Sequence, residues 1–493
     1  DPSRRGAGAA GSLAGPSPVA LLGVPFDKVT TAEALQCIGR MIQSDRPHYA
    51  ATANVDFVVQ ALGDVELRRI LTDADLVLCD GMPLVWASRI LGDALPERVA
   101  GSDLVPELLA EAERRGWRVF FLGGSPESLA RAADNVRRTH PELQLVGTYS
   151  PPFGPLLEMD QDDIVKRIRA ARPHILLVAF GCPKQEKWIN MHFRQLGVPF
   201  SIGVGATIDF LGGTVRRAPK WMQQSGLEWV FRLLQEPRRL FRRYVTDFWV
   251  FGWAILRQSW AFRAWHRGVP VPGRIGRPSA DRDALDWIDM GERLDAVTVR
   301  GHDRLWADLA GSGGPLLLDL SRIEFIDSTG VGHLVRLNKQ LRGRGRPLVL
   351  VAPSKPVRNA LALMRLEEVF CIAADPEAAR NAVRDREGDG EVRVAVGSGG
   401  VVESLEWCGD VTAANWEGVW RLTRPHLDDP RAVQAGLVIS LARVRFVDST
   451  GVRLMVRARR EAQQRGVRIR FTGAGPTVVN VLRILRLDQL LLG

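Results

Sequence analysis

Short apolar runs alternate with longer amphipathic stretches through the first half of the chain, between Leu21 and Gly213. Six of the runs have the length and flanks of buried strands. They are HYAATAN, DLVLCD, RVFFLGG, LQLVGTYS, HILLVAFG and FSIGVGA. The segments between them, such as SDLVPELLAEAERRG, carry apolar residues at helical spacing. Repeated strand, helix, strand units predict an α/β fold whose sheet is mostly parallel and covered by helices on both faces.

Polar residues follow the first two predicted strands. Thr52 and Asn54 end the first run, and Asp80 followed by Gly81 ends the second. In parallel sheets ligands bind beyond the carboxyl ends of the strands, so these residues are site candidates. Asn54 also opens a helical pattern, and capping that helix is its simplest role. For Asp80 the residues alone leave two roles open, a helix cap and a general base that faces the ligand crevice.

Three later strand ends add further candidates. Gly123 and Gly124 allow close backbone approach and precede a predicted helix N-terminus, which suits a phosphate. The segment AFGCPKQEKWI places Gln185 in a polar cluster at the predicted crevice. The segment GVGATIDFLGG contains Gly205 and Asp209 but lacks the third glycine of the dinucleotide fingerprint, so we do not expect NAD to bind.

Metal and cofactor signals are weak. The string DAD, from Asp73 to Asp75, looks like the DxD motif of metal-dependent sugar transferases, but it precedes its strand and is better interpreted as a turn. The eight histidines form no HExxH or HxxxH pair, and the five cysteines form no CxxC pair. The sequence therefore predicts no metal, no cofactor and a reduced cytosolic setting.

The net charge of +10 is concentrated between residues 214 and 268, which contain eleven arginines and lysines and only three acidic residues. The same segment holds six of the fourteen tryptophans. This composition is typical of a helix that lies in a membrane interface. The best apolar run, Phe248 to Leu256, is about half the roughly 20 residues that a bilayer crossing needs. The alternative is a basic surface helix packed on the core. We do not expect nucleic-acid binding, because no recognition motif is present.

The second half of the chain contains an internal repeat. The segment PLLLDLSRIEFIDSTGVGHLVRL matches GLVISLARVRFVDSTGVRLMVRA 121 residues later, which predicts two copies of one small domain. We expect a disordered leader (1–18), an α/β core (19–213), a basic helical appendage (214–268), a linker (269–284) and two small domains (285–384 and 391–493).

Several motifs occur in an order that identifies a family. They are TAN, DADLVLCDGMPLVWASRILG, ERVAGSDL, VFFLGG, GCPKQEKWI, GVGATIDFLGG, RRAPKWM and GLEWVFRLLQEPRR. From about Leu21 to Arg257 the chain resembles the WecG/TagA/CpsF glycosyltransferases, glycosyltransferase family 26. The resemblance implies a Rossmann-like, inverting, metal-independent enzyme. Such enzymes move a sugar, often N-acetylmannosamine or its uronic acid, from a UDP donor to a polyprenyl-diphosphate-linked sugar at the inner face of the membrane.

The resemblance also assigns roles to residues. It makes Asp80 the general base that takes a proton from the acceptor hydroxyl. The substrate-binding candidates are Thr52, Asn54, Asp103, Gly123, Gly124, Gln185, Gly205 and Asp209. The candidates for contact with the diphosphate or the membrane are Arg238, Arg239, Arg242 and Arg243. The chain departs from the family's usual DGxG motif in having Met82 and Pro83 after the glycine, and Pro83 suits a first helical turn.

Each DSTG segment resembles the start of the second helix in sulfate transporter and anti-sigma factor antagonist (STAS) domains. Ser328 and Ser449 match the serine that partner kinases phosphorylate in the antagonists. A phosphate there would lie at a helix N-terminus, which favours it, but beside Asp327 or Asp448, which does not. Plain helix capping in a scaffold that is not phosphorylated is the alternative.

The leading hypothesis is a membrane-associated sugar transferase that carries two regulatory or docking domains. Its expected partners are a UDP-sugar, a polyprenyl-diphosphate-linked sugar, the inner face of the plasma membrane and a kinase or other protein that binds the STAS domains. The alternative is a signalling protein whose α/β domain senses a nucleotide sugar and whose STAS pair supplies the output. The donor sugar, the polysaccharide and assembly into a homo-oligomer are left open.

Overall fold

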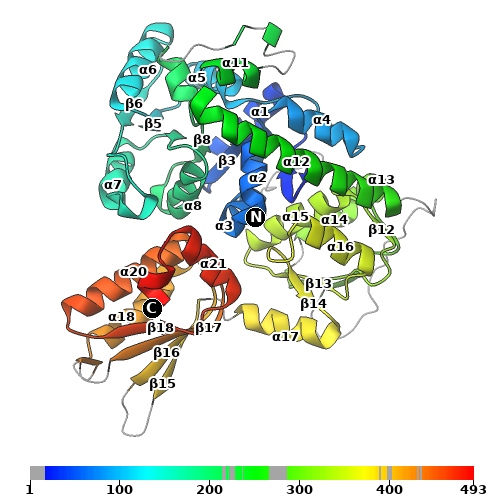
Figure 1. Ribbon diagram of the computed structural model, residues 1–493, viewed down its shortest axis with the longest axis vertical. Helices are drawn as coiled ribbons and strands as arrows, with labels where there is room; N and C mark the ends of the chain where they lie inside the picture. Colours follow the sequence, from blue (N-terminus) through cyan, green and yellow to red (C-terminus); the bar gives the residue numbers. More distant parts are fainter. Residues whose placement is uncertain are drawn as a thin grey trace, which may run out of the picture.

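The computed structural model describes residues 17–213, 218–219, 221–222, 228–235, 237–265, 286–311, 313–387, 390–396, 402–429, 432–433 and 436–492. The predicted linker 269–284 and all but the last two residues of the predicted leader lie outside these ranges. Three parts are arranged side by side: the α/β core with its appendage, a first module of residues 286–387 and a second module of residues 390–492 (Figure 1).

The core is built on a six-stranded sheet in which every strand pair is parallel, in the order β4-β3-β8-β7-β5-β6. Its strands are β3 (His48–Ala53), β4 (Leu76–Cys79), β5 (Val119–Gly123), β6 (Leu145–Tyr149), β7 (Ile175–Ala179) and β8 (Phe200–Gly203). Each lies within one of the six predicted runs. The predicted parallel sheet is confirmed.

Helices cover both faces of this sheet. They are α1 (Thr31–Ile42), α2 (Val55–Gly63), α3 (Val65–Asp73), α4 (Met82–Ile90), α5 (Gly101–Arg115), α6 (Pro126–Thr139), α7 (Gln161–Ala171), α8 (Lys184–Leu196) and α9 (Thr207–Leu211), with the 3-10 helix η1 (Leu156–Glu158). Strand β5 shows the two layers: Phe120 and Leu122 enter one hydrophobic core, whereas Val119 and Phe121 enter the other. Strand side chains alternate between faces, so both faces of the sheet are apolar.

The described part of the appendage includes the helices α11 (Glu228–Gln235) and α12 (Pro237–Trp265). The long helix α12 crosses over α2 and runs on to the first module (Figure 1). Its inner side chains join two cores, because Phe251 and Ile255 pack with the α/β core and Phe262 packs with the first module.

The two modules are small α/β units. The first contains β9 (Asp286–Asp289), β10 (Arg293–Leu294), α13 (Ala296–Gly301), α14 (Asp303–Gly311), β11 (Leu316–Asp319), β12 (Phe325–Ile326), α15 (Ser328–Arg342), β13 (Leu348–Val351), α16 (Lys355–Leu363), β14 (Cys371–Ala373) and α17 (Pro376–Glu387). The second contains β15 (Val392–Val396), β16 (Val402–Val411), α18 (Trp416–Leu427), β17 (Leu437–Val447), α20 (Ser449–Gln464), β18 (Ile469–Thr472), α21 (Pro476–Ile484) and α22 (Asp488–Leu492). Their sheet orders are β14-β13-β11-β9 and β15-β16-β17-β18.

The repeated DSTG segment has the same local structure in both modules. Helix α15 begins at Ser328 and α20 begins at Ser449, and the preceding aspartate caps each helix. Asp327 accepts a hydrogen bond from the Gly330 amide, and Asp448 does the same with the amides of the two residues after Ser449. The repeat seen in the sequence is therefore a structural repeat.

An N-terminal hairpin of β1 (Val19–Leu21) and β2 (Val24–Phe26) joins the core to the first module. Val19 and Leu21 pack in a core of the α/β domain, whereas Ala20, between them, packs in the core of the first module. Gly332 of α15 permits this contact, since a Cβ atom there would lie 2.1 Å from the Pro18 carbonyl oxygen.

Helix α3 touches both modules. Arg69 donates to the Asp410 carboxylate of the second module at 2.9 Å and to the Glu368 carbonyl of the first module at 2.6 Å. Arg68 donates to the Arg365 carbonyl at 2.7 Å. Figure 1 shows α3 where the three parts meet.

Candidate functional site

The carboxyl ends of β3, β4, β5, β7 and β8 meet at one edge of the sheet, here called the carboxyl edge. At the end of β3, the Thr52 hydroxyl donates to the Gly203 carbonyl of β8 at 3.1 Å. The Asn54 side chain accepts from the Phe57 amide at 3.2 Å and caps α2. Thr52 is buried and Asn54 is half-buried. Both predicted residues lie at this edge, and their recorded hydrogen bonds organise its backbone.

Asp80 follows β4 directly. Its amide donates to the Ala53 carbonyl at 2.9 Å, which holds Asp80 beside the end of β3. Helix α4 begins at Met82, Gly81 is its N-cap residue, and no side chain caps it. Asp80 is therefore not the N-cap residue of this helix. The Asp80 residue is half-buried at the carboxyl edge, and Pro83 takes the first turn of α4 as expected.

Arg98 connects this edge to the appendage, and the sequence did not single it out. Its guanidinium donates to the Asp103 carboxylate at 2.6 Å and to the Glu228 carboxylate of α11 at 2.7 Å. Burial lowers the pKa of Arg98, but the carboxylates of Glu228, Asp80 and Asp103 outweigh burial and leave that pKa above its usual value. A permanent cation thus lies in the electrostatic reach of Asp80. Arg98 belongs to the quoted ERVAGSDL segment, but no local pattern reveals its partners.

Gln185 ties two strand ends together. Its Oε1 accepts from the Gly181 amide after β7 and from the Gly205 amide after β8, both at 3.1 Å. Its Nε2 donates to Glu186 at 2.7 Å. The close fit requires glycine at position 203, where a Cβ atom would lie 2.6 Å from the Gln185 Nε2. Gln185 is 2% exposed, so its amide lies beneath the carboxyl edge and holds the loops above it in place.

Glu186 is a buried acid directly beside Gln185. Burial raises the pKa of Glu186 to about 8, although the hydrogen bond from Gln185 acts in the opposite direction. At neutral pH this carboxyl is therefore mostly protonated. The sequence predicted that Gln185 and the polar cluster around it, which includes Glu186, face the crevice. Both side chains are instead buried beneath the carboxyl edge.

Gly123 and Gly124 allow β5 and β7 to approach closely. Gly123 has φ +96°, and a Cβ atom there would lie 2.6 Å from the Ala179 carbonyl oxygen. The Gly124 amide donates to that same oxygen at 3.0 Å. These glycines therefore serve the packing of the strand ends. Asp209 lies half-buried on the short helix α9, next to α6.

One of the four candidate arginines reaches the core. The Arg243 guanidinium lies 3.8 Å from the Asp56 carboxylate, two residues after Asn54. Arg238 and Arg242 are exposed on α12, and the Arg239 side chain lies outside the described part of the structure. Arg243 is also exposed, and its ion pair with Asp56 near the start of α2 is what distinguishes it from Arg238 and Arg242.

The outer face of α12 is apolar as well as basic. Its exposed hydrophobic side chains recur at helical spacing: Phe241, Val245, Phe248, Trp249, Val250, Trp253, Leu256 and Trp260. Trp249, Trp253 and Trp260 are each at least 70% exposed. Across the described ranges, no helix is both long and apolar enough to cross a bilayer. Three of the six tryptophans predicted to lie in a membrane interface, Trp249, Trp253 and Trp260, are therefore exposed along one helix.

The two acids of the DAD string have structural partners. Asp73 pairs with Arg342 of the first module at 3.2 Å. Asp75 pairs with His48 and Arg46, each at 3.0 Å. Burial disfavours the charge of Asp75, but His48, Lys339 and Arg46 together outweigh burial and lower the pKa of Asp75 to about 2. Both acids form ion pairs, and neither lies at the carboxyl edge of the sheet.

The serines of the two DSTG segments are buried against the rest of the chain. The Ser328 hydroxyl accepts from Gln258 of α12 at 3.0 Å. The Ser449 hydroxyl donates to Glu66 of α3 at 2.9 Å. The exposed fractions of the two serines are 1% and 0%. Neither hydroxyl is open to a partner kinase in this arrangement.

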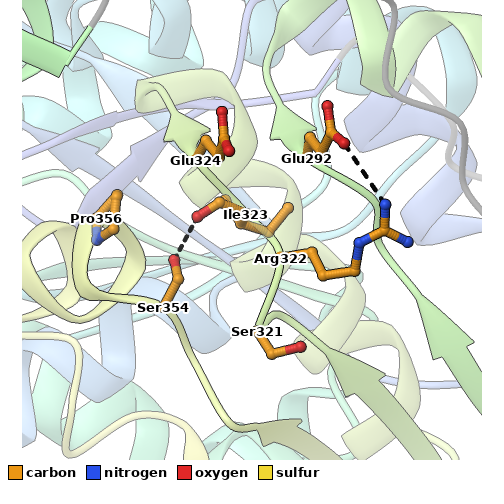
Figure 2. A pocket seen from close by; sticks show the side chains of 7 residues that line it. All are labelled: Glu292, Ser321, Arg322, Ile323, Glu324, Ser354 and Pro356. Carbon is orange, nitrogen blue, oxygen red and sulfur yellow. Dashed lines mark hydrogen bonds and ion pairs between the residues drawn. The ribbon is translucent and has the colours of Figure 1, made fainter.

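A shallow pocket lies elsewhere, on the first module (Figure 2). It is lined by Glu292, Ser321, Arg322, Ile323, Glu324, Ser354 and Pro356. The Ser354 hydroxyl donates to the Ile323 carbonyl, and Arg322 pairs with Glu292 at 3.5 Å. None of these residues belongs to the carboxyl edge. We therefore assign this pocket no role.

Comparison with known proteins gives three family matches. Residues 19–264 match the glycosyl transferase WecG/TagA/CpsF family, residues 288–379 match the STAS domain, and residues 394–493 match the STAS domain of the Mlab type.

Relatives from three bacteria are each named N-acetylglucosaminyldiphosphoundecaprenol N-acetyl-beta-D-mannosaminyltransferase. The Bacillus spizizenii protein is 31% identical over 42% of this chain and 80% of its own length. The Bacillus subtilis protein is 31% identical over 38% of this chain and 72% of its own length. The Staphylococcus aureus protein is 28% identical over 45% of this chain and 87% of its own length.

A solved structure described as an anti-sigma factor antagonist from Thermotoga maritima matches 22% of this chain and 94% of its own. Its sequence identity is 24% and its TM-score is 0.20, so it carries no argument of its own.

Proposed function

The chain belongs to the WecG/TagA/CpsF family of glycosyltransferases, and we propose that it transfers an N-acetylmannosamine-type sugar from a UDP-sugar to polyprenyl-diphosphate-linked N-acetylglucosamine. The names of its relatives support the acceptor, since each relative is named for transfer to N-acetylglucosaminyldiphosphoundecaprenol. The product would be a lipid-linked disaccharide for a cell-surface polysaccharide.

The observation that carries this proposal is the position of Asp80. Asp80 is half-buried at the carboxyl edge, is not the N-cap residue of α4, and lies in the field of Arg98. Such a carboxylate suits a general base. Asp80 accepts the proton of the acceptor hydroxyl as that oxygen attacks the anomeric carbon. The bond from that carbon to UDP breaks at the same time, and UDP leaves with the bonding electrons.

The leaving diphosphate gains negative charge as this bond breaks, and fixed cations are needed to stabilise that charge. Arg243 is the best candidate among the four arginines, because its guanidinium lies beside Asp56 at the start of α2. Asn54, two residues earlier, is available at the same strand end for the sugar or the nucleotide. Gln185 supports the site from below by fixing the loops at Gly181 and Gly205.

The acceptor lipid requires contact with a membrane, and α12 supplies a suitable surface. Its exposed tryptophans would lie in the headgroup region while Arg238 and Arg242 bind anionic lipid. Arg243 follows on the same helix. One helix would therefore seat the enzyme on the inner face of the plasma membrane and bring a cation to the carboxyl edge.

A UDP-release assay on the purified full chain tests the proposal. The chain is mixed with UDP-N-acetylmannosamine and polyprenyl-diphosphate N-acetylglucosamine, in vesicles that contain anionic lipid. UDP release that requires both substrates is the expected result. Donor binding without UDP release would overturn the proposal and favour the alternative of a nucleotide-sugar sensor with STAS output.

A further inference from the structure

The second module docks on the α/β core through the first residue of helix α20. The Glu66 carboxylate of α3 accepts two hydrogen bonds from Ser449, one from its amide at 2.5 Å and one from its hydroxyl at 2.9 Å. The first amides of a helix have no partner within the helix, and the helix dipole favours an anion there. Glu66 therefore acts as a capping group supplied by another domain, and it is 1% exposed.

Glu66 is also one of three residues in a buried ion cluster in the core. Lys187 of α8 lies 2.9 Å from the Glu66 carboxylate and 2.7 Å from the Asp64 carboxylate. Burial lowers the pKa of Lys187, but Glu66 and Asp64 outweigh burial and hold that pKa above its usual value. A buried lysine needs such partners, because an unpaired charge is costly in the interior. The Ser449 contact thus ends on a cation of helix α8.

Helix α8 carries Gln185, two residues before Lys187, and Gln185 fixes the loops at Gly181 and Gly205. A second contact joins the same elements, because Asn190 of α8 donates to Asp448 at 3.4 Å. Hydrogen bonds and an ion pair therefore connect the DSTG segment of the second module to Lys187, and helix α8 itself connects Lys187 to Gln185, which binds two strand ends of the carboxyl edge.

We propose that the second STAS module is a positioning element of the transferase, which holds α8 and the loops at the carboxyl edge in place through Ser449, Glu66 and Lys187. The inference rests on the proposed function for its catalytic consequence. The three residues are positioning residues, because they act on the site through Gln185. The docking partner of the second DSTG segment is then the catalytic domain of the same chain.

The first module provides a matched comparison. Its Ser328 is the equivalent residue, but it contacts Gln258 of α12 in place of a carboxylate on α3. Gln258 binds the N-terminal hairpin, through the Ala20 carbonyl and the Leu22 amide, each at 3.0 Å. The contact of Ser328 with Gln258 therefore leads to the hairpin, whereas the contact of Ser449 with Glu66 leads to α8. The same substitution in the two modules should affect different parts of the core.

Hydrogen exchange on the full chain tests this inference independently of activity. Ser449→Ala removes the charge-assisted hydrogen bond from the Ser449 hydroxyl to Glu66 and keeps the one from the amide. We expect amides in 181–205 to exchange about tenfold faster than in the wild type. Ser328→Ala should leave this segment at the wild-type rate and speed exchange in 17–26. Faster exchange confined to residues 402–492 in Ser449→Ala would overturn the proposal.

A second pair of variants covers the case in which loss of the hydroxyl is tolerated. Ser449→Asp places another carboxylate beside Glu66 and Asp448, and we expect it to release the module and speed exchange in 181–205 further. Glu66→Gln keeps an acceptor for Ser449 but loses the ion pair with Lys187, and it should give the same pattern. Wild-type exchange in 181–205 for both variants would contradict the proposed link from Ser449 through Glu66 and Lys187 to α8.

Steady-state kinetics then separate this inference from the proposed function. In Ser449→Ala we expect kcat to fall several-fold while binding to vesicles is unchanged. Unchanged kcat and KM, with an active wild type, would contradict the catalytic part of the inference. A wild type without transfer activity would instead overturn the proposed function. The exchange data would still decide whether Ser449 is linked to α8 through Glu66 and Lys187.

Discussion

Arg98 binds Glu228 across 2.7 Å, and this ion pair attaches the first helix of the appendage to the loop before α5. Both partners are largely buried. The second guanidinium branch of Arg98 binds Asp103 at 2.6 Å, so one side chain holds the appendage and the start of α5 together. The planar fork of arginine allows two such contacts at fixed angles. Arg98 therefore couples the helices proposed for the membrane surface to the strand end that carries Asp80.

Replacing Arg98 with lysine tests this coupling. Lysine keeps the charge but cannot maintain both contacts, and a charge-assisted hydrogen bond contributes about 1.5–3 kcal/mol. We expect kcat/KM to fall about tenfold or more and residues 228–235 to become sensitive to protease. Arg167→Lys is the control, because Arg167 is exposed and pairs within α7 with Asp163. Equal kinetics for the two variants would show that the Arg98 fork is dispensable.

Asp80→Asn should remove turnover and leave the fold intact. The amide cannot accept the proton of the acceptor hydroxyl, and loss of a general base costs about 10² to 10⁴ in rate. The Tm should stay near that of the wild type, because Asp80 is not the N-cap residue of α4. Asp134→Asn, at an exposed position of α6, is the matched control and should keep full activity. Near-normal UDP release by Asp80→Asn would remove the residue from the mechanism.

The aromatic face of α12 should govern binding to vesicles. Burying a large apolar side chain contributes about 1.5–3 kcal/mol, so Trp253→Ala should weaken partition into anionic vesicles about tenfold. Arg242→Glu should weaken it as well, and the effect should shrink as salt is added. Phe153→Ala is the control, since Phe153 is fully exposed on the loop after β6. Flotation measures all three variants, and equal flotation would exclude α12 as the membrane face.

The contact between α12 and α2 should depend on pH. Burial, together with Asp56, raises the pKa of Asp247 to about 6, while Arg243 acts in the opposite direction. The unfolded value is about 3.9, so between these pH values the folded chain holds a proton that the unfolded chain has lost. The contribution of Asp247 to the free energy of unfolding is therefore complete below pH 4 and is lost as the pH rises through 6.

Asp247→Asn should remove this part of the pH dependence. We expect the variant to have a higher Tm than the wild type at pH 7.5 and a similar Tm at pH 4.5, as measured by thermal unfolding at both values. The buried Asp327 and Asp448, whose pKa values burial also raises to about 6, act in the same direction and cancel in the comparison. An unchanged Tm difference between the two pH values would refute the assignment to Asp247.

The sequence was sufficient for the sheet and for the position of Asp80. Apolar runs of strand length followed by helical patterns define β3 to β8, because all these strands except the half-buried edge strand β6 are buried on both faces. The internal repeat was also predictable from the sequence, because Asp327 and Asp448 cap helices that begin at the very next residue. Features that depend on neighbours in the chain were therefore predictable.

Contacts between distant segments were not predictable in this way. Gln185 follows a strand end, and the pattern there is the same for a side chain that faces a ligand and for one that lies beneath it. Arg98 and Glu228 are 130 residues apart, and Glu66 and Ser449 are 383 residues apart. No local periodicity records such pairs, so only the packing of the domains reveals them.

The hairpin at the start of the chain constrains how the protein is made. Ser17, just before β1, contacts His333 of α15, 316 positions further along the chain. A ribosome adds about 5–20 residues per second, so the hairpin waits roughly a quarter of a minute to a minute for its second covering layer. Until α15 emerges, Ala20 and its neighbours face solvent or a chaperone. The catalytic domain of this chain therefore reaches its final form only after the first STAS module has been synthesised.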